Sequence, residues 1–288
     1  MKVTVIGLGL IGGSLARSLR KNGLATSLVG VETNASHAEE ALQLGLVDQV
    51  QSMEEGCAEA DLVVLAIPVD AARQLVLAVL DLVLPQAVVA DMGSTKEGIC
   101  KTVEKHEKRG QFVAAHPIAG TENTGPRAAI DGLFTEKVAI ICNREQSSEA
   151  ALECVEEMFR VLQMNVISMN SKEHDEHIAY VSHLSHISSF ALGNTVLEIE
   201  KDEKSIFNMA GSGFASTVRL AKSAPSMWAP IFAQNHENIS AALAIYINKL
   251  THFKKLIDEK DIEGLASLMS DANEVRRVLE GIELNNNH

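Results

Sequence analysis

The chain has 288 residues, of which 46% are hydrophobic and 22% charged, so it has the composition of a globular protein and the length for two domains. Its 38 acidic residues outnumber its 25 basic residues, the net charge is −13, and no cluster of Lys and Arg stands out. A nucleic acid or an anionic membrane surface is therefore not expected as a partner.

The N-terminal stretch MKVTVIGLGLIGGSLARSL has a single Lys before a short apolar run that glycines interrupt. This pattern fits neither a signal peptide nor a membrane span, so a cytoplasmic location is expected. The cysteines at positions 57, 100, 142 and 154 are widely spaced, without a CxxC pair. They are expected to be reduced thiols that pack in the core.

Residues 2–169 alternate between short β-rich runs and helical stretches, which predicts a doubly wound α/β domain. Runs such as VVLAI lack in/out alternation and are typical of strands in a parallel sheet that helices cover on both faces. The expected strands are KVTVI (2–6), SLVGV (27–31), DLVVLAI (61–67), AVVADM (87–92), QFVAAH (111–116), KVAIIC (137–142) and MNVISM (164–169).

A glycine-rich turn follows the first strand directly and leads into an amphipathic helix. The turn consists of Gly7, Leu8, Gly9, Leu10, Ile11 and Gly12. Its GxGxxG pattern permits a tight turn and close approach of the backbone to a pyrophosphate at the helix start. Glu32 follows the second strand, where an acid binds the ribose hydroxyls, and no Arg or Lys in 33–40 suits a 2′-phosphate. NAD is therefore expected over NADP, although such a turn can also serve only to pack a strand on a helix.

Three later strands end in polar or special residues, and ligands of open α/β sheets bind beyond such carboxyl ends. The residues are Pro68 after the third strand, then Asp91, Ser94 and Lys96, and then His116, Thr121 and Glu122. A histidine beside a nicotinamide can accept the hydroxyl proton as hydride leaves carbon. His116 is therefore the candidate base, and Ser94 is a candidate to position the substrate oxygen or the imidazole. The simpler alternative is that His116 only bonds a backbone carbonyl at the strand end.

After residue 169 no convincing β run occurs, and 171–200, 226–257 and 261–281 have apolar residues at helical spacing. Residues 1–169 are therefore expected to form the NAD-binding domain and residues 170–288 an all-helical domain. No Gly/Ser linker separates them, so they are expected to pack against each other.

The stretch EHDEHIAYVSHLSH, residues 173–186, contains four of the ten histidines. On one regular helix of about 100° per residue, Asp175, Ser182, His183 and His186 share a face, and His174 and His177 point away. His174 and His177 are therefore expected to be solvated surface, and no metal site is expected. A buried histidine that bonds a backbone carbonyl is an alternative that fits His183 better than His186.

The motifs GLGLIGGSLA, DMGSTK, HPIAGTE, SHLSH and SGFASTVRLA, in this order, resemble the prephenate dehydrogenase family, which includes arogenate and cyclohexadienyl dehydrogenases. The resemblance covers nearly the whole chain. It implies an N-terminal Rossmann-type domain, a helical C-terminal domain that forms a homodimer, and a form without a C-terminal ACT domain. It also implies NAD-dependent oxidative decarboxylation of prephenate to 4-hydroxyphenylpyruvate, a step of tyrosine biosynthesis.

The resemblance also implies roles for individual residues. It places the catalytic histidine on His116, the assisting serine on Ser94, the substrate-binding histidine on His186 and the carboxylate-binding arginine on Arg219. Further substrate contacts are implied at Ser182, His183 and Thr121, and acidic groups at the pocket mouth at Glu122 and Asp175. Without the resemblance, Arg219 would be interpreted as a partner in a surface salt bridge.

The chain departs from the family pattern at Ala215 and Ser216, where many members have a basic and an acidic residue. Ion pairs at the pocket entrance must therefore be absent or rebuilt, which affects the roles of Glu122 and Asp175. Three alternatives remain open: arogenate as the substrate, a non-catalytic NAD-binding redox sensor, and a β-hydroxyacid dehydrogenase, which normally uses a lysine in its helical domain.

Overall fold

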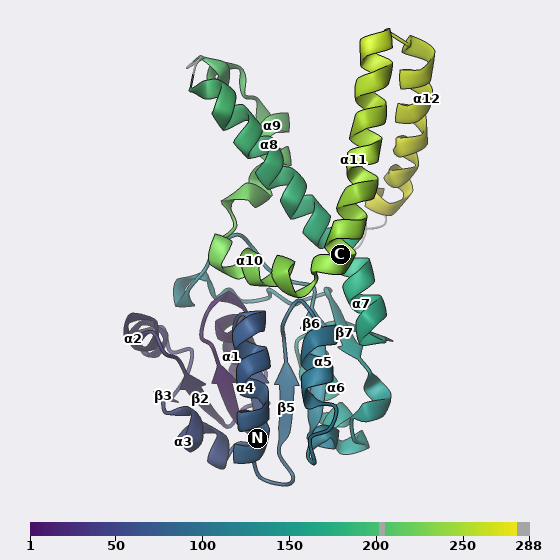
Figure 1. The fold of residues 1–288 in the computed structure, drawn as a ribbon. Helices are drawn as coiled ribbons and strands as arrows, with labels where there is room; N and C mark the ends of the chain where they lie inside the picture. The colour runs from purple at the N-terminus through teal and green to yellow at the C-terminus, as the bar shows by residue number, and fades with distance from the viewer. Residues whose placement is uncertain (202–204, 281–288) are drawn as a thin grey trace. The chain divides into compact units, whose positions relative to one another are not determined.

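The computed structural model describes residues 1–201 and 205–280. Its sheet has eight strands in the order β3-β2-β1-β4-β5-β6-β7-β8 (Figure 1). The strands are β1 (Lys2–Ile6), β2 (Ser27–Val31), β3 (Gln49–Val50), β4 (Leu62–Leu65), β5 (Val88–Asp91), β6 (Phe112–Pro117), β7 (Val138–Cys142) and β8 (Asn165–Met169). The predicted doubly wound domain is confirmed, and the two-residue strand β3 was not predicted.

Helices connect most of these strands, and further helices follow the sheet. In the sheet region they are α1 (Leu10–Lys21), α2 (Ala35–Gln43), α3 (Met53–Ala58), α4 (Val69–Leu82), α5 (Glu97–Val103) and α6 (Glu149–Val161). After the sheet they are α7 (Ser171–Ile178), α8 (Leu184–Glu200), α9 (Ser212–Thr217), α10 (Pro225–Gln234), α11 (His236–Glu259) and α12 (Ile262–Ala272). Among the described residues beyond 169 no strand occurs, as predicted.

Two apolar clusters lie on opposite faces of the sheet because side chains alternate along each strand. On β6, Val113 and Ala115 belong to the cluster that α1 and α6 cover. Phe112 and Ala114 belong to the cluster that α3, α4 and α5 cover. These inner strands are buried on both faces, which explains their continuous apolar sequences.

The last two strands of the sheet, β7 and β8, run opposite to the other six. β7 is antiparallel to β6, and β8 is parallel to β7. The segment between β6 and β7 contains only a 3₁₀ turn at Pro126–Ala128, whereas a parallel crossover usually needs a helix. The parallel pairing expected of the buried inner strands therefore holds from β3 to β6, and the sheet becomes mixed at the pairing of β6 with β7.

The helix predicted over 226–257 is two helices, which meet at the buried residue Asn235. The stretch 171–200 is helical throughout, but a π-helical turn at Ala179–His183 separates α7 from α8. Such a turn contains extra residues per turn and rotates all later side chains relative to a regular helix. The single-helix geometry assumed for residues 173–186 was therefore wrong.

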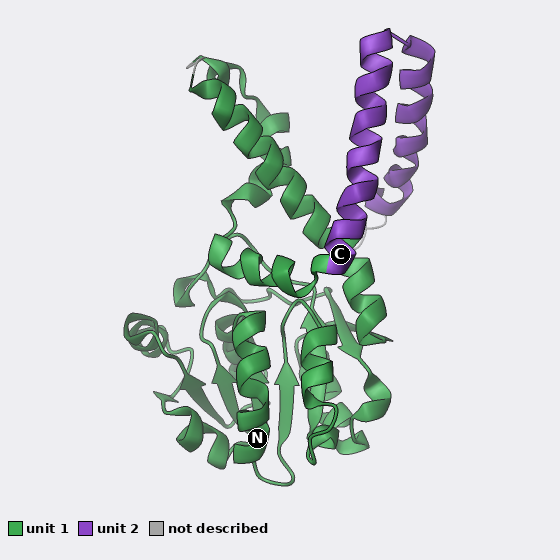
Figure 2. Cartoon of the chain, viewed as in Figure 1, with its two compact units in different colours: residues 1–236 green, residues 237–288 purple. Residues whose placement is uncertain are grey.

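The chain divides into two compact units, residues 1–236 and residues 237–288 (Figure 2). The sheet and the segments from α7 to α10 belong to the first unit, and nearly all of α11 and all of α12 belong to the second. The boundary predicted between residues 169 and 170 lies inside the first unit, and the two domains remain a prediction.

All four cysteines are free thiols. Cys57, Cys100 and Cys142 are buried, as expected of packing residues. Burial raises the pKa of Cys57 and of Cys100 to about 11 and that of Cys142 to about 12. These three thiols therefore stay protonated and unreactive near neutral pH.

Candidate active site

The glycine turn between β1 and α1 combines close packing with one open position. A Cβ atom on Gly7, whose φ is +93°, would lie 2.6 Å from the carbonyl oxygen of Ala66. A Cβ on Gly12 would lie 1.9 Å from the carbonyl oxygen of Gly7. Around Gly9, by contrast, no atom lies within 4 Å of a built Cβ. Two glycines thus close the turn and the third leaves the space at the start of α1 that a pyrophosphate needs.

The other predicted cofactor residues surround this turn. Glu32 follows β2, and its carboxylate accepts hydrogen bonds from the backbone N–H groups of Leu8 (3.1 Å) and Asn34 (2.9 Å). It is thus held beside the glycine turn, where a ribose hydroxyl can approach it. Leu10 and Ile11 form the first turn of α1, partly buried, and Pro68 is exposed ahead of α4. These residues fit a dinucleotide bound across the carboxyl ends of β1, β2 and β4.

A buried lysine joins the carboxyl ends of β5 and β6. The ammonium group of Lys96 forms an ion pair with Asp91, at the end of β5, and also donates a hydrogen bond to the carbonyl oxygen of Ala115 (2.7 Å) on β6. Lys96 is fully buried and Asp91 is 1% exposed. Since Ala115 directly precedes His116, this contact fixes the backbone that carries the candidate base.

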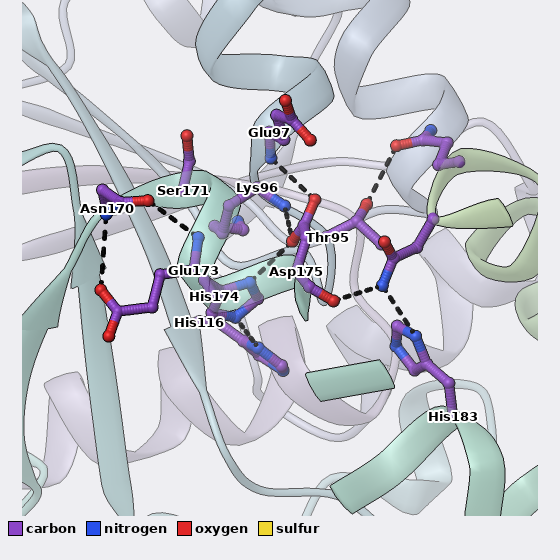
Figure 3. A network of polar contacts seen from close by, with 12 residues as sticks. Thr95, Lys96, Glu97, His116, Asn170, Ser171, Glu173, His174, Asp175 and His183 are labelled. Carbon is purple, nitrogen blue, oxygen red and sulfur yellow. Dashed lines mark hydrogen bonds and ion pairs between the residues drawn. The ribbon is translucent and has the colours of Figure 1, made fainter. Parts of the chain in front are cut away.

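His116 belongs to a chain of hydrogen bonds that leads into α7 (Figure 3). Its Nδ1 lies 2.8 Å from Nε2 of His174, and Nδ1 of His174 lies 2.7 Å from a carboxylate oxygen of Asp175. The Asp175 carboxylate also accepts from the backbone N–H groups of Lys96 (2.8 Å) and Glu97 (2.9 Å) at the start of α5. A helix start favours an anion there. The base is therefore connected to a buried carboxylate through a second histidine.

This arrangement corrects two expectations. His174 was predicted to be solvated surface but is 1% exposed, whereas His177 is exposed as predicted. Asp175 was predicted at the pocket mouth but is 3% exposed and bonded within the protein. The physical reason is that α7 packs against α5 and the end of β6, so more than one of its faces is covered.

Burial sets the protonation of these histidines. It holds the pKa of His116 well below its usual value, and the charge that His174 would carry if protonated, the cationic Lys96 and the charge that His183 would carry if protonated lower it further. Burial also lowers the pKa of His174, although Asp175 opposes that shift. Both rings are therefore neutral near pH 7, and His116 is ready to accept a proton.

A second polar group surrounds His186 on α8. Its ring stacks on Trp228 at 3.5 Å between centroids and 25° between planes, and its Nδ1 donates a hydrogen bond to the Ser182 carbonyl oxygen (3.0 Å). Burial lowers the pKa of His186, and the positive charge of Arg219 contributes to that shift. A guanidinium nitrogen of Arg219 lies 3.5 Å from a carboxylate oxygen of Glu122. The structure thus brings His186, Arg219 and Glu122 together from distant parts of the sequence.

His183 and Asn235 lie between the two groups. The Asn235 amide donates to the Asp175 carbonyl oxygen (2.7 Å) and lies 3.2 Å from Nδ1 of His183. His183 therefore has a side-chain partner, and the bond to a backbone carbonyl belongs to His186, opposite to the expectation. Burial lowers the pKa of His183 to about 4.

The remaining predicted residues make fewer contacts. Ser94 lies partly buried in the β5–α5 loop, and among the described residues the His116 ring bonds His174 rather than this serine. Thr121 is exposed after β6, and its hydroxyl accepts a hydrogen bond from the Asn123 backbone N–H (3.2 Å). Ser182 is part of the π-helical turn and contributes its carbonyl oxygen.

Sequence reasoning missed His174, Asn235 and Trp228. His174 was dismissed by helical phase, and Asn235 had no signal because it was placed inside a predicted helix. Trp228 is the only tryptophan of the chain, but nothing in the sequence indicates that it stacks on a histidine of another helix.

No group of three or more potential metal ligands is formed by residues 1–201 and 205–280. In the same part of the chain, no helix has the length and apolar character required to cross a membrane.

Comparison with known proteins gives matches over almost the whole chain. Residues 15–168 match the family "Prephenate dehydrogenase, nucleotide-binding domain", and residues 170–271 match "Prephenate dehydrogenase, dimerization domain". Prephenate dehydrogenase of Bacillus subtilis is 28% identical over 284 residues, which cover 96% of this chain and 76% of that protein. Cyclohexadienyl dehydrogenase of Zymomonas mobilis is 27% identical over 280 residues, which cover 96% of each protein.

Solved structures give the same result. Prephenate dehydrogenase of Aquifex aeolicus, in complex with hydroxyphenyl propionate and NAD⁺, has 31% identity and a TM-score of 0.88, covering 97% of this chain and 98% of that one. Synechocystis arogenate dehydrogenase has 26% identity and a TM-score of 0.75, covering 97% and 100%. Since the nucleotide-binding match alone spans more than half of the chain, and the dimerization match follows it, the chain belongs to the prephenate dehydrogenase family, which includes arogenate and cyclohexadienyl dehydrogenases.

Proposed function

We propose that this protein is an NAD-dependent prephenate dehydrogenase that converts prephenate to 4-hydroxyphenylpyruvate and CO2. The observation that carries the proposal is the position of His116. It lies at the carboxyl end of β6, in the same sheet as the β1 glycine turn, with Nδ1 bonded to His174 and Nε2 left for a substrate.

In the proposed reaction His116 is the base. Its neutral ring accepts the ring-hydroxyl proton of prephenate while hydride leaves the same carbon, and loss of CO2 then makes the ring aromatic. NAD, when bound, accepts the hydride. Ser94, in the loop after β5, is proposed to bind the substrate hydroxyl. It is not assigned to orient His116, because Nδ1 of His116 is bonded to His174.

Arg219 and His186 are proposed to bind the rest of the substrate. Prephenate carries two carboxylates, and a guanidinium can bind a carboxylate through two parallel hydrogen bonds. The Nδ1 hydrogen bond to the Ser182 carbonyl and the stacking on Trp228 hold the His186 ring, and its Nε2 edge is proposed to face the substrate. Glu122, Thr121, Ser182 and His183 are proposed as further contacts or supports of this pocket.

Two features of the nucleotide site support NAD. The open space at Gly9 suits a pyrophosphate, and Glu32 would accept hydrogen bonds from a ribose but repel a 2′-phosphate. The Aquifex aeolicus relative was solved with NAD⁺. Gly7, Gly12, Leu10, Ile11 and Pro68 complete the proposed cofactor site.

Arogenate is a second candidate substrate, and one contact favours it. Arogenate has an ammonium group where prephenate has a keto oxygen, and the Glu122 carboxylate beside Arg219 can accept hydrogen bonds from an ammonium. We expect Glu122→Gln to weaken binding of arogenate more than binding of prephenate. Equal effects on the two KM values would exclude this role for Glu122.

We also propose that the protein is a homodimer through its helical part. Several large apolar side chains are exposed on the helices that follow the sheet, and exposed apolar side chains in such numbers are typical of a surface that a partner covers. On α8 these are Leu192, Leu197 and Ile199. On α11 and α12 they are Ile245, Ile247, Leu250, Ile257, Ile262 and Met269. Light scattering of the purified protein tests the oligomeric state.

One assay tests the enzyme proposal. Purified protein is mixed with NAD or NADP and with prephenate or arogenate, and the reduced nicotinamide is followed by its absorbance. We expect turnover with NAD and prephenate, and a collapse of kcat in His116→Asn with little change in binding. If neither substrate is turned over while NAD binds, the protein is a non-catalytic NAD-binding sensor and the proposal fails.

A further inference from the structure

His174 is buried directly behind the candidate base, at a position to which the family resemblance assigned no role. It bonds His116 on one side and Asp175 on the other (Figure 3). Both residues are shielded from solvent, since His174 is 1% exposed and Asp175 is 3% exposed. Two buried ionisable groups in a row are costly to keep unless they have a use.

The direction of each hydrogen bond follows from the donors around Asp175. Its two carboxylate oxygens face the backbone N–H groups of Lys96 and Glu97, so the group acts as an acceptor. Nδ1 of His174, at 2.7 Å, must therefore carry the proton. A neutral imidazole has one N–H, so Nε2 of His174 is an acceptor, and Nδ1 of His116 at 2.8 Å must donate to it.

We propose that His174 and Asp175 are positioning residues that hold His116 in the tautomer with its proton on Nδ1, so that the unprotonated Nε2 faces the substrate. The inference rests on the proposed function, since it assigns these residues to the reaction of His116. When Nε2 accepts the substrate proton, the imidazolium forms at the end of a chain that terminates in a carboxylate. Asp175 stabilises that charge through His174, as the aspartate of a Ser-His-Asp triad does for its histidine.

Other ionisable groups lie near the hydrogen-bonded residues His116, His174 and Asp175 and affect the pKa values of the two histidines. They are Lys96 at the start of α5, Asp91 at the end of β5 and His183 in the π-helical turn. Lys96 is paired with Asp91, and His183 is neutral near pH 7 because burial lowers its pKa to about 4. Asp175 is therefore the anion that acts on His116 through hydrogen bonds.

The test compares two replacements of the second histidine with a matched control. In His174→Phe the ring volume is kept but His116 has no acceptor, so we expect kcat to fall about 10- to 100-fold while KM values stay unchanged. In His174→Gln the side-chain carbonyl can accept from Nδ1 of His116, so we expect most of kcat to return. His177→Phe, on the exposed side of the same helix, should match the wild type.

The pH profile separates positioning from packing. Asp175→Asn keeps one oxygen acceptor but removes the negative charge that stabilises the His116 imidazolium. Without the Asp175 charge the pKa of His116 falls further. The pH below which kcat/KM declines should therefore move to a lower value. If that pH does not change, or if His174→Gln is as inactive as His174→Phe, the proposal is overturned.

A spectroscopic measurement shows, without substrate, which nitrogen of His116 carries the proton. Long-range ¹H–¹⁵N correlation spectra distinguish the two imidazole tautomers, and the His116 signals are assigned by their absence in His116→Gln. We expect the wild type to carry the His116 proton on Nδ1 and His174→Phe to lose that preference. A wild-type proton on Nε2 would refute the relay, even if the enzyme turns over neither prephenate nor arogenate and the proposed function fails.

Discussion

Lys96→Met should strongly destabilise the fold, because it removes one partner of a buried ion pair. The Lys96 side chain is fully buried, and the change leaves the 1%-exposed Asp91 without its cation and the Ala115 carbonyl without its donor. Breaking a buried pair on one side costs about 3–5 kcal/mol, since an uncompensated charge remains in the core. This is a large part of the about 5–15 kcal/mol that stabilises a typical protein.

Urea unfolding followed by circular dichroism measures the free energy of unfolding. Lys172→Met is the matched control, since the Lys172 side chain is 71% exposed on α7 and its loss should leave the midpoint near that of the wild type. The double variant Asp91→Asn with Lys96→Met should be more stable than Lys96→Met alone, because the carboxylate that lost its cation is replaced by a neutral amide. A loss below about 1 kcal/mol in Lys96→Met would refute the reasoning, since surface pairs lose no more than that.

Four further outcomes are expected. Gly12→Ala should abolish NAD binding in a calorimetric titration, because the added Cβ would overlap the Gly7 carbonyl oxygen, and retained affinity would contradict that packing. Glu32→Ser should raise KM for NAD and reduce the preference for NAD over NADP in initial-rate assays, whereas an unchanged ratio would exclude its ribose role. Arg219→Ala should mainly raise KM for prephenate, and a loss of kcat alone would argue against carboxylate binding. Stability should fall as pH drops from about 6.5 towards 4, because His183 binds a proton in the unfolded chain first and its folded pKa is about 4; His183→Gln should lessen the fall in melting temperature.

The nucleotide-binding part of the fold was predictable because its signals are local. A buried strand, a glycine turn and an amphipathic helix follow one another within residues 2–21, and each depends on neighbours in the sequence. Glu32 was likewise found from its spacing after the turn. Strand direction at β7 was not predictable in this way, because it depends on how the segment 118–137 crosses the sheet.

The candidate site shows the same division. His116 was identified from its place at a strand end, which the sequence specifies directly. His174 was misplaced because helical phase gives only the relative directions of side chains on one helix and not which of its faces are covered. The π-helical turn at Ala179–His183 added to the error, since it rotates His186 relative to His174.

The sequence by itself therefore determined the order of the seven longer strands, the glycine turn, and the identity of the candidate base. Only the tertiary structure decided that α7 lies against α5 and β6, so that His174 and Asp175 stand behind His116. The physical reason is that burial arises from contacts between segments far apart in the chain. A histidine in a polar stretch of sequence can thus be buried where packing excludes water and supplies a hydrogen-bond acceptor.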